Sequence, residues 1–338
     1  MRYRTLISIT LGAVYFLILI GGIVRSTGSG MGCPDWPTCF GQWVPPTKAE
    51  ELPSNYKENY SAHRDKKNLR FAAFLEAIGM KQTAYRLRND ESIRKEADFN
   101  AVKTWTEYMN RLVGMVVGLL VTAVFIVSVS YFKTKKSVVL TTGLALLTVI
   151  VTGWFGSIVV STNLTPWTVT LHMALALVTV ALLVLTKFLV ENKEEVIQKP
   201  MFVWLSAGLL LTVIQIFLGT QVRESVDQVA TNNPDRTLWV GQLGTVFLVH
   251  RSLSWLLLIV NAFIGWRVYQ AGWVREGITL FIVLAVSLIS GAAMSWFDIP
   301  AFLQPVHLLG GALLFGVQFS LWLNYRPVCV STFQLKTT

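Results

Sequence analysis

Apolar residues along the chain are concentrated in eight long runs, separated by shorter polar breaks. The runs cover residues 6–24, 108–132, 138–160, 169–190, 202–222, 244–268, 278–295 and 302–323. Each is close to the length of about 20 residues that a helix needs to cross a bilayer, and none shows the alternation of a strand. Because lipid offers the backbone no water to bond, the pattern predicts an all-α integral membrane fold with eight transmembrane helices.

The composition indicates that lipid surrounds much of this chain. Apolar residues make up 53% of the sequence and charged residues 14%, against about 25% charged in a soluble domain. The net charge is +10, but many basic residues lie in the short breaks, where they set topology, and we expect no nucleic-acid partner. The first run is longer than the apolar core of a secretory signal, so it predicts a retained span.

Lysine and arginine are distributed unevenly between the two ends of the predicted helices. An even number of spans places both termini on one side, and that side collects Arg2, Arg4, Lys133, Lys135, Lys136, Lys187, Lys193, Lys199, Arg267, Arg275, Arg326 and Lys336. The links 161–166 and 296–301 on the other side contain none. The positive-inside rule therefore predicts a multi-pass protein of the cell membrane with both termini in the cytoplasm. The long hydrophilic segment 25–106 then lies outside, and its Trp, Phe and Cys content predicts an ordered cap with a helix over 71–88.

The chain also repeats itself. Three registers agree in order: Gly21-x-x-Val24-Arg25 with Gly219-x-x-Val222-Arg223, Asn110-Arg111 with His250-Arg251, and Gly156…His172 with Gly291…His307. The agreement predicts two halves of four helices each in parallel topology. The first half is 1–190, with the large outer loop 25–106, and the second is 201–325.

Three of the four histidines, His172, His250 and His307, lie near the outer ends of predicted spans. Ionisable residues inside a membrane are costly and mark a functional site by default. A single histidine there is equally well explained by a hydrogen bond between helices or by a proton relay. The pair in the second half, His250 and His307, favours two axial ligands of one haem in a helical bundle. His63 lies in the charged loop, where a solvated side chain is expected.

Four arginines and one glutamate accompany the histidines near the outer membrane face. The arginines are Arg25, Arg111, Arg223 and Arg251. They are either interfacial anchors or partners of haem propionates, and position alone does not decide. Glu107 precedes Asn110 by one helical turn, so both share one helix face. It is either a favourable charge at a helix N-terminus or an acid/base group beside a porphyrin.

Cysteines flank a short turn just outside the first span. Cys33 and Cys39 indicate a disulfide or an exposed redox couple in an oxidising compartment, and the disulfide is favoured over zinc, which needs further ligands nearby. Cys329 falls on the cytoplasmic side and is expected to be an unpaired thiol.

Together these motifs resemble the haem A synthase family. The resemblance is carried by 21–39 (GGIVRSTGSGMGCPDWPTC), by 107–111 (EYMNR), and by His172, His250-Arg251 and His307. It implies two four-helix bundles related by a pseudo-twofold axis, each with a porphyrin site. It implies a haem b cofactor between His250 and His307, and haem O as the substrate of the N-terminal bundle. The C8 methyl group of haem O would be oxidised to a formyl group, with Glu107 important for the reaction and the Cys33–Cys39 pair in the first outer loop.

The resemblance also implies partners, namely a haem O synthase and an oxidase-assembly or electron-accepting protein. Our hypothesis is that His172 and the outer arginines orient haem O with its C8 methyl near Glu107, while electrons leave through haem b. One rival is a b-type cytochrome that takes electrons from quinol without modifying haem. A second is a repeat-built transporter whose histidines relay protons.

One residue departs from the family pattern. The second predicted span carries Asn110 where the family has histidine, and an amide is a poor ligand for haem iron. Either the substrate haem is five-coordinate on His172, with Asn110 bonded to a distal water, or His63 folds in as a ligand; we favour the first. The long outer loop looks like an insertion, and the second outer loop, 223–242, lacks the cysteine pair of some members.

Overall fold

The computed structural model describes residues 2–90, 93, 96–162, 166–191 and 199–325, and its long elements are helices. Eight of these helices are long and apolar enough to cross a membrane. They are α1 (Tyr3–Ser26), α4 (Ala101–Ser128), α5 (Lys136–Ser161), α6 (Pro166–Glu191), α7 (Lys199–Asn232), α9 (Thr245–Gln270), α10 (Val274–Trp296) and α11 (Leu303–Asn324). The all-α membrane fold predicted from the apolar runs is confirmed.

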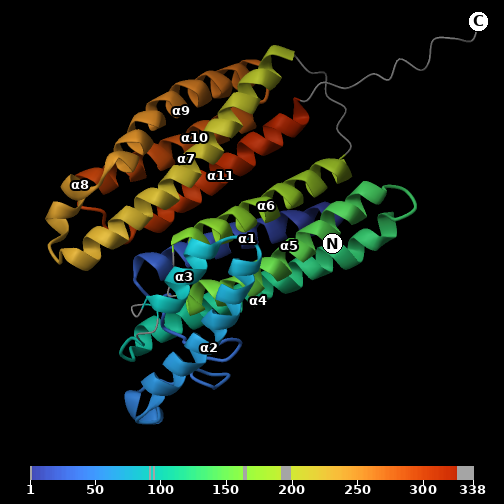
Figure 1. The fold of residues 1–338 in the computed structure, drawn as a ribbon. Helices are drawn as coiled ribbons and strands as arrows, with labels where there is room; N and C mark the ends of the chain where they lie inside the picture. The colour runs from blue at the N-terminus through green and yellow to red at the C-terminus, as the bar shows by residue number, and fades with distance from the viewer. Residues whose placement is uncertain (1, 91–92, 94–95, 163–165, 192–198, 326–338) are drawn as a thin grey trace, which may run out of the picture.

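The eight helices pack in two sets (Figure 1). The N-terminal set is α1, α4, α5 and α6, and the C-terminal set is α7, α9, α10 and α11. They meet where α11 packs against α1 and α6, and where α6 touches α7. The pseudo-twofold relation between the sets, and the division into halves at 1–190 and 201–325, stay predictions.

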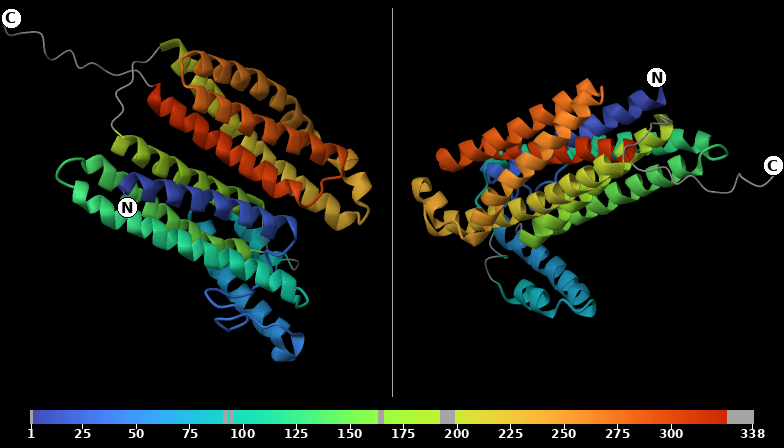
Figure 2. Two further views of the ribbon diagram at one scale, coloured as in Figure 1. Left: turned by 180° about the vertical axis from the view of Figure 1, so that it is seen from behind. Right: turned by 90° about the horizontal axis from the view of Figure 1, so that it is seen from above.

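The seam between the sets depends on close approach of α1 and α11. A Cβ atom at Gly22 would lie 3.0 Å from the Cα of Pro305, and one at Gly316 would overlap the hydroxyl of Tyr15. Glycine at these two positions lets the helices approach closely, and α1 and α11 are neighbours in Figure 2. A side chain at either position would hold the two helices apart, which is why small residues favour close packing of membrane helices.

A cap formed by residues 27–90, 93 and 96–100 stands on one end of the N-terminal set (Figures 1 and 2). The single helix predicted over 71–88 is wrong: α2 (Tyr56–Ala77) and α3 (Lys81–Asn89) are separate helices. Gly79 adopts a positive φ of 88° between them, a conformation that ends a helix. The side chain of Asn68 donates to the carbonyl of Ser161 at 2.7 Å, and the ring of Phe71 stacks on Trp167, so α2 rests on the ends of α5 and α6.

A buried ion pair holds the cap together. Arg64 on α2 bonds the carboxylate of Glu96, and their side chains are only 2% and 3% exposed. Burial lowers the pKa of Arg64 and raises the pKa of Glu96, and each charge offsets the cost of burying the other. The segment before α4 is thereby tied to α2.

The second outer loop is more helical than predicted. The apolar run ends at 222, yet α7 continues to Asn232, and η4 (Arg236–Leu238) and α8 (Trp239–Gln242) follow. Spacing of four residues supports the extension, since Arg223 pairs with Asp227 at 2.8 Å. The extension of α7 beyond residue 222 is polar, so the apolar runs in the sequence do not predict it.

Helix α1 begins and α11 ends at the end opposite the cap (Figures 1 and 2). Arg4 there pairs with Glu191, and Lys135 donates to the carbonyl of Leu189. Several residues used in the sequence argument lie outside the described part of the chain: residues 163–165 of the link 161–166, Lys193, Arg326, Cys329 and Lys336.

Candidate functional site

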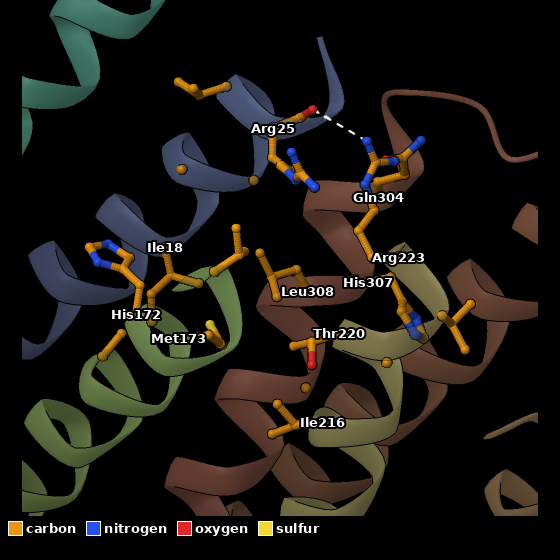
Figure 3. Close-up of a pocket in the computed structure, with 18 of the residues that line it drawn as sticks. Ile18, Arg25, His172, Met173, Ile216, Thr220, Arg223, Gln304, His307 and Leu308 are labelled. Carbon is orange, nitrogen blue, oxygen red and sulfur yellow. Dashed lines mark hydrogen bonds between the residues drawn. The ribbon is translucent and has the colours of Figure 1, made fainter. Parts of the chain in front are cut away.

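A cavity of about 1670 Å³ lies between the two sets near their cap ends. Nine of the residues singled out in the sequence line it: Arg25, Glu107, Asn110, Arg111, His172, Arg223, His250, Arg251 and His307. Figure 3 shows His172 on one side and His307 on the other, with Ile18, Met173, Leu308 and other apolar side chains between them. The structure therefore brings the repeat-related motifs to one continuous, mainly apolar space.

At the C-terminal end of this cavity, two imidazoles face each other. The ring centroids of His250 and His307 are 6.2 Å apart. With metal–nitrogen bonds of about 2 Å and a ring radius of roughly 1.2 Å on each side, one metal ion would hold two such centroids about 6 Å apart. The observed separation fits a single iron between the rings.

Hydrogen bonds position these two residues. Nδ1 of His307 lies 2.9 Å from the carbonyl of Ser287 and 3.2 Å from the hydroxyl of Ser290, both on α10. An Nδ1–H group donating to the carbonyl leaves Nε2 as the free ligand nitrogen. On the other side, Gln215 donates to the backbone carbonyl of His250 at 2.8 Å and ties α7 to α9.

Each candidate ligand lies against a glycine of a neighbouring helix. A Cβ atom would lie 3.4 Å from His250 at Gly219, and 2.9 Å from His307 at Gly291. The same relation recurs in the N-terminal set. There, a Cβ would lie 3.5 Å from His172 at Gly156, and 3.9 Å from Asn110 at Gly21. The glycines found by the repeat therefore make room for the four side chains at the four corresponding positions.

The N-terminal end of the cavity presents different side chains from those of the C-terminal end. His172 Nδ1 and Asn110 Oδ1 are buried there without a hydrogen-bond partner among the described residues, as is Nδ1 of His250 at the C-terminal end. His63 lies on α2 with an exposed side chain and is not among the residues lining the cavity. This end thus offers one imidazole and one amide, and nothing in the described chain places His63 as a second ligand.

Glu107 is only 3% exposed and lies at the rim between the N-terminal end and the cap. Its carboxylate accepts from Arg111 at 2.6 Å and from the backbone N–H of Cys33 at 3.0 Å. Arg111 also donates to the carbonyls of Cys33, Asp35 and Thr38. The pair therefore holds the loop after α1 against α4.

Cys33 and Cys39 are joined by a disulfide and are fully buried. They pack with Phe40 and neighbouring aromatic side chains of the cap. Of the two alternatives in the sequence argument, the structure has the disulfide, and it is enclosed. It closes the same loop that Glu107 and Arg111 grip.

Arginines from both sets meet at the seam beside the cavity. Arg25 of α1 and Arg223 of α7 both pair with Asp227, and Arg223 also bonds Gln304 on α11. The dashed line in Figure 3 marks a further bond from Arg223 to the carbonyl of Arg25. Arg251 instead lies over the ring of Phe247, 5.7 Å from its centroid. Three of the four arginines are thus held by carboxylates.

Comparisons with known proteins decide the family. Residues 4–81 and 76–319 match the family described as cytochrome oxidase assembly protein, which is most of the chain. The chain belongs to this family.

Several relatives of this cytochrome oxidase assembly protein are named heme A synthase. That of Nitrosospira multiformis is 24% identical over 350 residues, covering 93% of this chain and 90% of the relative. That of Exiguobacterium sibiricum is 24% identical over 262 residues, covering 73% and 69%. That of Shewanella oneidensis is 42% identical over 52 residues, which is 15% of this chain and 16% of the relative. No solved structure gives a significant match to the chain.

The residues of this family member fit the haem that the resemblance predicts at the C-terminal end. The spacing of the two rings suits one iron, and Gly219 and Gly291 leave space that a Cβ would fill. Within the described residues, no three His, Cys, Asp or Glu side chains gather as a metal site. An apolar slot with two imidazoles is what a porphyrin iron needs.

Sequence reasoning missed some residues in and beside this cavity. Asp227 had a local signal, because it follows Arg223 by four residues. Its bond to Arg25 joins positions 202 residues apart, and no sequence pattern reports that contact. Gln304, Gln215 and Thr212 were also missed, although polar residues inside apolar runs are a recognisable signal.

Proposed function

We propose that this protein is a haem A synthase, an oxidoreductase that converts the C8 methyl group of haem O to a formyl group for terminal oxidases. The observation that carries the proposal is one cavity with two unlike ends. One end presents two facing imidazoles, and the other presents one imidazole, one amide and a buried glutamate. The family and the names of the relatives support the same activity.

The C-terminal end suits haem b as the resident cofactor. His250 and His307 would hold its iron, with the orientation of His307 set by Ser287 and Ser290. Bound there, haem b supplies one-electron redox chemistry. The lining contributed by α7, α9 and α10 is mainly apolar, which suits the faces of a porphyrin.

The N-terminal end suits haem O as the substrate. We assign His172 as the ligand of the substrate iron, which leaves that iron five-coordinate, with the Asn110 amide as a hydrogen-bonding group on the opposite face. Glu107 is the proposed acid/base group. Its carboxylate lines the cavity while two donors fix its position, so a proton can be held at a defined place.

The propionate partners belong to the same proposal. Arg251 is in the cavity lining with no carboxylate partner among the described residues, so its guanidinium is free to bind a propionate. Arg25 and Arg223 share one aspartate and retain a net positive charge as a cluster. Arg111 is already bonded to Glu107 and three carbonyls, and its proposed role is to hold the substrate side in place.

The membrane location, the topology and the partners belong to the same proposal. We place this multi-pass protein in the cell membrane with both termini in the cytoplasm, and the cap with the cavity at the outer face. The proposed partners are a haem O synthase that delivers the substrate and an oxidase-assembly or electron-accepting protein. The two helix sets are proposed as the substrate half (1–190) and the cofactor half (201–325).

Pigment analysis of cells that also make haem O tests the proposal. We expect haem A in extracts from cells expressing the wild-type chain, identified by mass, and only haem O with Glu107→Gln. Purified Glu107→Gln protein should keep its b-type absorption spectrum. A b-type cytochrome would give bound haem b and no haem A in either strain, and that result would overturn the proposal.

A further inference from the structure

Four polar side chains are buried in the middle of the C-terminal set, below the histidine pair. They are Thr212, Gln215, Asn261 and Gln318, exposed by 1%, 9%, 0% and 0%. They come from α7, α9 and α11, all of which are membrane-spanning helices. Uncharged polar groups at this depth are costly unless they are bonded.

These side chains lie at successive levels of the C-terminal set, leading away from the histidine pair. On α7, positions 208, 212, 215 and 219 follow the spacing of one helix face. Thr212 and Gln215 line the floor of the cavity, and Thr212 lies about 10 Å along the helix from Gly219, which touches His250.

The series continues beyond the floor of the cavity. Gln318 donates to Asn261, and a Cβ atom at Gly208 would lie 3.5 Å from the Gln318 amide nitrogen, so the amide packs against α7. Further along, Trp322 donates to the hydroxyl of Ser206 at 2.9 Å, near the end of the helices opposite the cap.

Three acceptor oxygens in this series have no partner among the described residues. They are Oγ1 of Thr212, Oε1 of Gln215 and Oε1 of Gln318. A buried polar atom without a partner costs about 1–3 kcal/mol. Such atoms are usually satisfied by ordered water, which bonds two to four polar groups at once. Three of them along one path indicate a ligand that has hydrogens to donate.

The N-terminal set shows that helix packing alone does not require these groups. By the registers of the repeat, the counterparts of Thr212, Gln215, Asn261 and Gln318 are Val14, Leu17, Val121 and Leu183. All four counterparts belong to or pack against the apolar core of the N-terminal set. One set of helices therefore assembles with apolar side chains at the positions where the other set carries amides and a hydroxyl.

We propose that Thr212, Gln215, Asn261 and Gln318 bind a file of ordered water molecules that extends from the floor of the cavity toward the Ser206–Trp322 bond. The ligand is water, held by the three free oxygens and by the amide groups. The proposal goes beyond the proposed enzyme activity and does not depend on which haem is bound. The competing explanation, polar contacts that only hold the helices together, predicts a dry path.

Hydroxyl-radical footprinting of the purified full-length protein tests the water file, because radicals made from bound water oxidise the side chains next to it. The reporters are Ile264 and Val260, which are buried beside Gly208 and do not line the cavity, and the references are Val121 and Leu183 in the N-terminal set. We expect oxidation at the reporters at least about fivefold above the references. In a brief pulse of ¹⁸O-labelled water, the reporters should incorporate ¹⁸O.

The double variant Thr212→Val and Gln318→Leu introduces the side chain types of the N-terminal counterparts. It should lower oxidation at Ile264 and Val260 to the level of the references. The matched control is Thr186→Val, which removes a buried hydroxyl that already has partners, and it should leave the reporters unchanged. Size exclusion and circular dichroism confirm folding; if the double variant does not fold, Thr212→Val alone should still lower oxidation at Val260. Reporters no more oxidised than the references in the wild type, or unchanged in a folded variant, would overturn the proposal.

Discussion

The two ends of the cavity share one scaffold and differ in a few side chains. Each presents two side chains that lie against glycines of neighbouring helices. At the C-terminal end both side chains are histidines, and the neighbouring positions on α9 are Phe247 and Arg251. At the N-terminal end the matching positions are Asn110 and His172, with Glu107 and Arg111. On the proposed assignment, the comparison teaches that the scaffold sets where a porphyrin would fit, while the side chains would decide whether its iron has one protein ligand or two.

The difference at Glu107 and Phe247 also extends to the cap. Glu107 binds Arg111 and the disulfide loop, whereas Phe247 offers Arg251 only an aromatic face. On the proposed function, a carboxylate at the first position would serve as an acid/base group beside the substrate, and the cofactor end would need none. The predictions below test this contrast, from the largest expected effect to the smallest.

Replacing the carboxylate of Glu107 should have the largest effect. Glu107→Gln keeps the shape and removes the base, so haem A formation should fall by about 10² to 10⁴-fold, the usual contribution of a general acid/base. The control is Glu50→Gln, a carboxylate on the exposed part of the cap, with an unchanged rate expected. The measurement is the initial rate of haem A formation. A wild-type rate in Glu107→Gln would show that Glu107 is not the acid/base group.

Breaking the ion pair of the cap should destabilise only the N-terminal end. Arg64→Ala leaves Glu96 buried without its partner, at a cost of about 3–5 kcal/mol. We expect faster proteolysis of the cap and lower haem A formation, with the b-type spectrum kept. Arg88→Ala removes an exposed pair with Glu76 and should change proteolysis little. Equal proteolysis of the two variants would show that the buried pair does not hold the cap.

Adding a methyl group behind each histidine should distinguish the two ends. Gly291→Ala places a Cβ 2.9 Å from the ring of His307, so the ring must move, at a cost of about 1–3 kcal/mol. Gly156→Ala meets His172 at 3.5 Å, an ordinary contact, and should be close to neutral. The thermal midpoint of the haem-bound protein in detergent reports both. A Gly156→Ala loss equal to that of Gly291→Ala would argue against the tight fit at His307.

Converting the amide to an imidazole should make the two ends alike. Asn110→His places a second ring opposite His172, where Gly21 leaves at least as much room as Gly219 leaves His250. We expect a second low-spin, six-coordinate haem signal by electron paramagnetic resonance. Asn110→Ala should add none. One unchanged signal in Asn110→His would show that the two ends are not equivalent scaffolds.

Much of the fold could be predicted from the sequence because lipid imposes a length on every span. The run 278–295 and the helix α10 differ by only a few residues at each end. The helix ends that extend beyond the apolar runs were harder to predict, because the helix continues there with polar residues. Helix α7 runs on to Asn232, and α4 starts at Ala101, where Asn100 caps it by accepting from Lys103. The break at Gly79 was readable only as turn chemistry, which the helix prediction over 71–88 overlooked.

The candidate site divides in the same way. The repeat picked out the glycines and their partner residues because spacing along a helix survives in sequence. Contacts between distant segments left no such trace: the bond from Cys33 to Glu107 spans 74 residues, and the bond from Arg25 to Asp227 spans 202. The buried amides of the C-terminal set were visible as polar letters in apolar runs, but their alignment required the structure.

The central claim is that His250 and His307 hold one haem while the N-terminal end holds the substrate. The most direct measurement is the reduced-minus-oxidised absorption spectrum of purified His250→Ala, His307→Ala and His172→Ala proteins, expressed without a haem O source. The account predicts that the first two lose the b-type spectrum and that the third keeps it. A b-type spectrum that survives in the His250→Ala and His307→Ala double variant would contradict it.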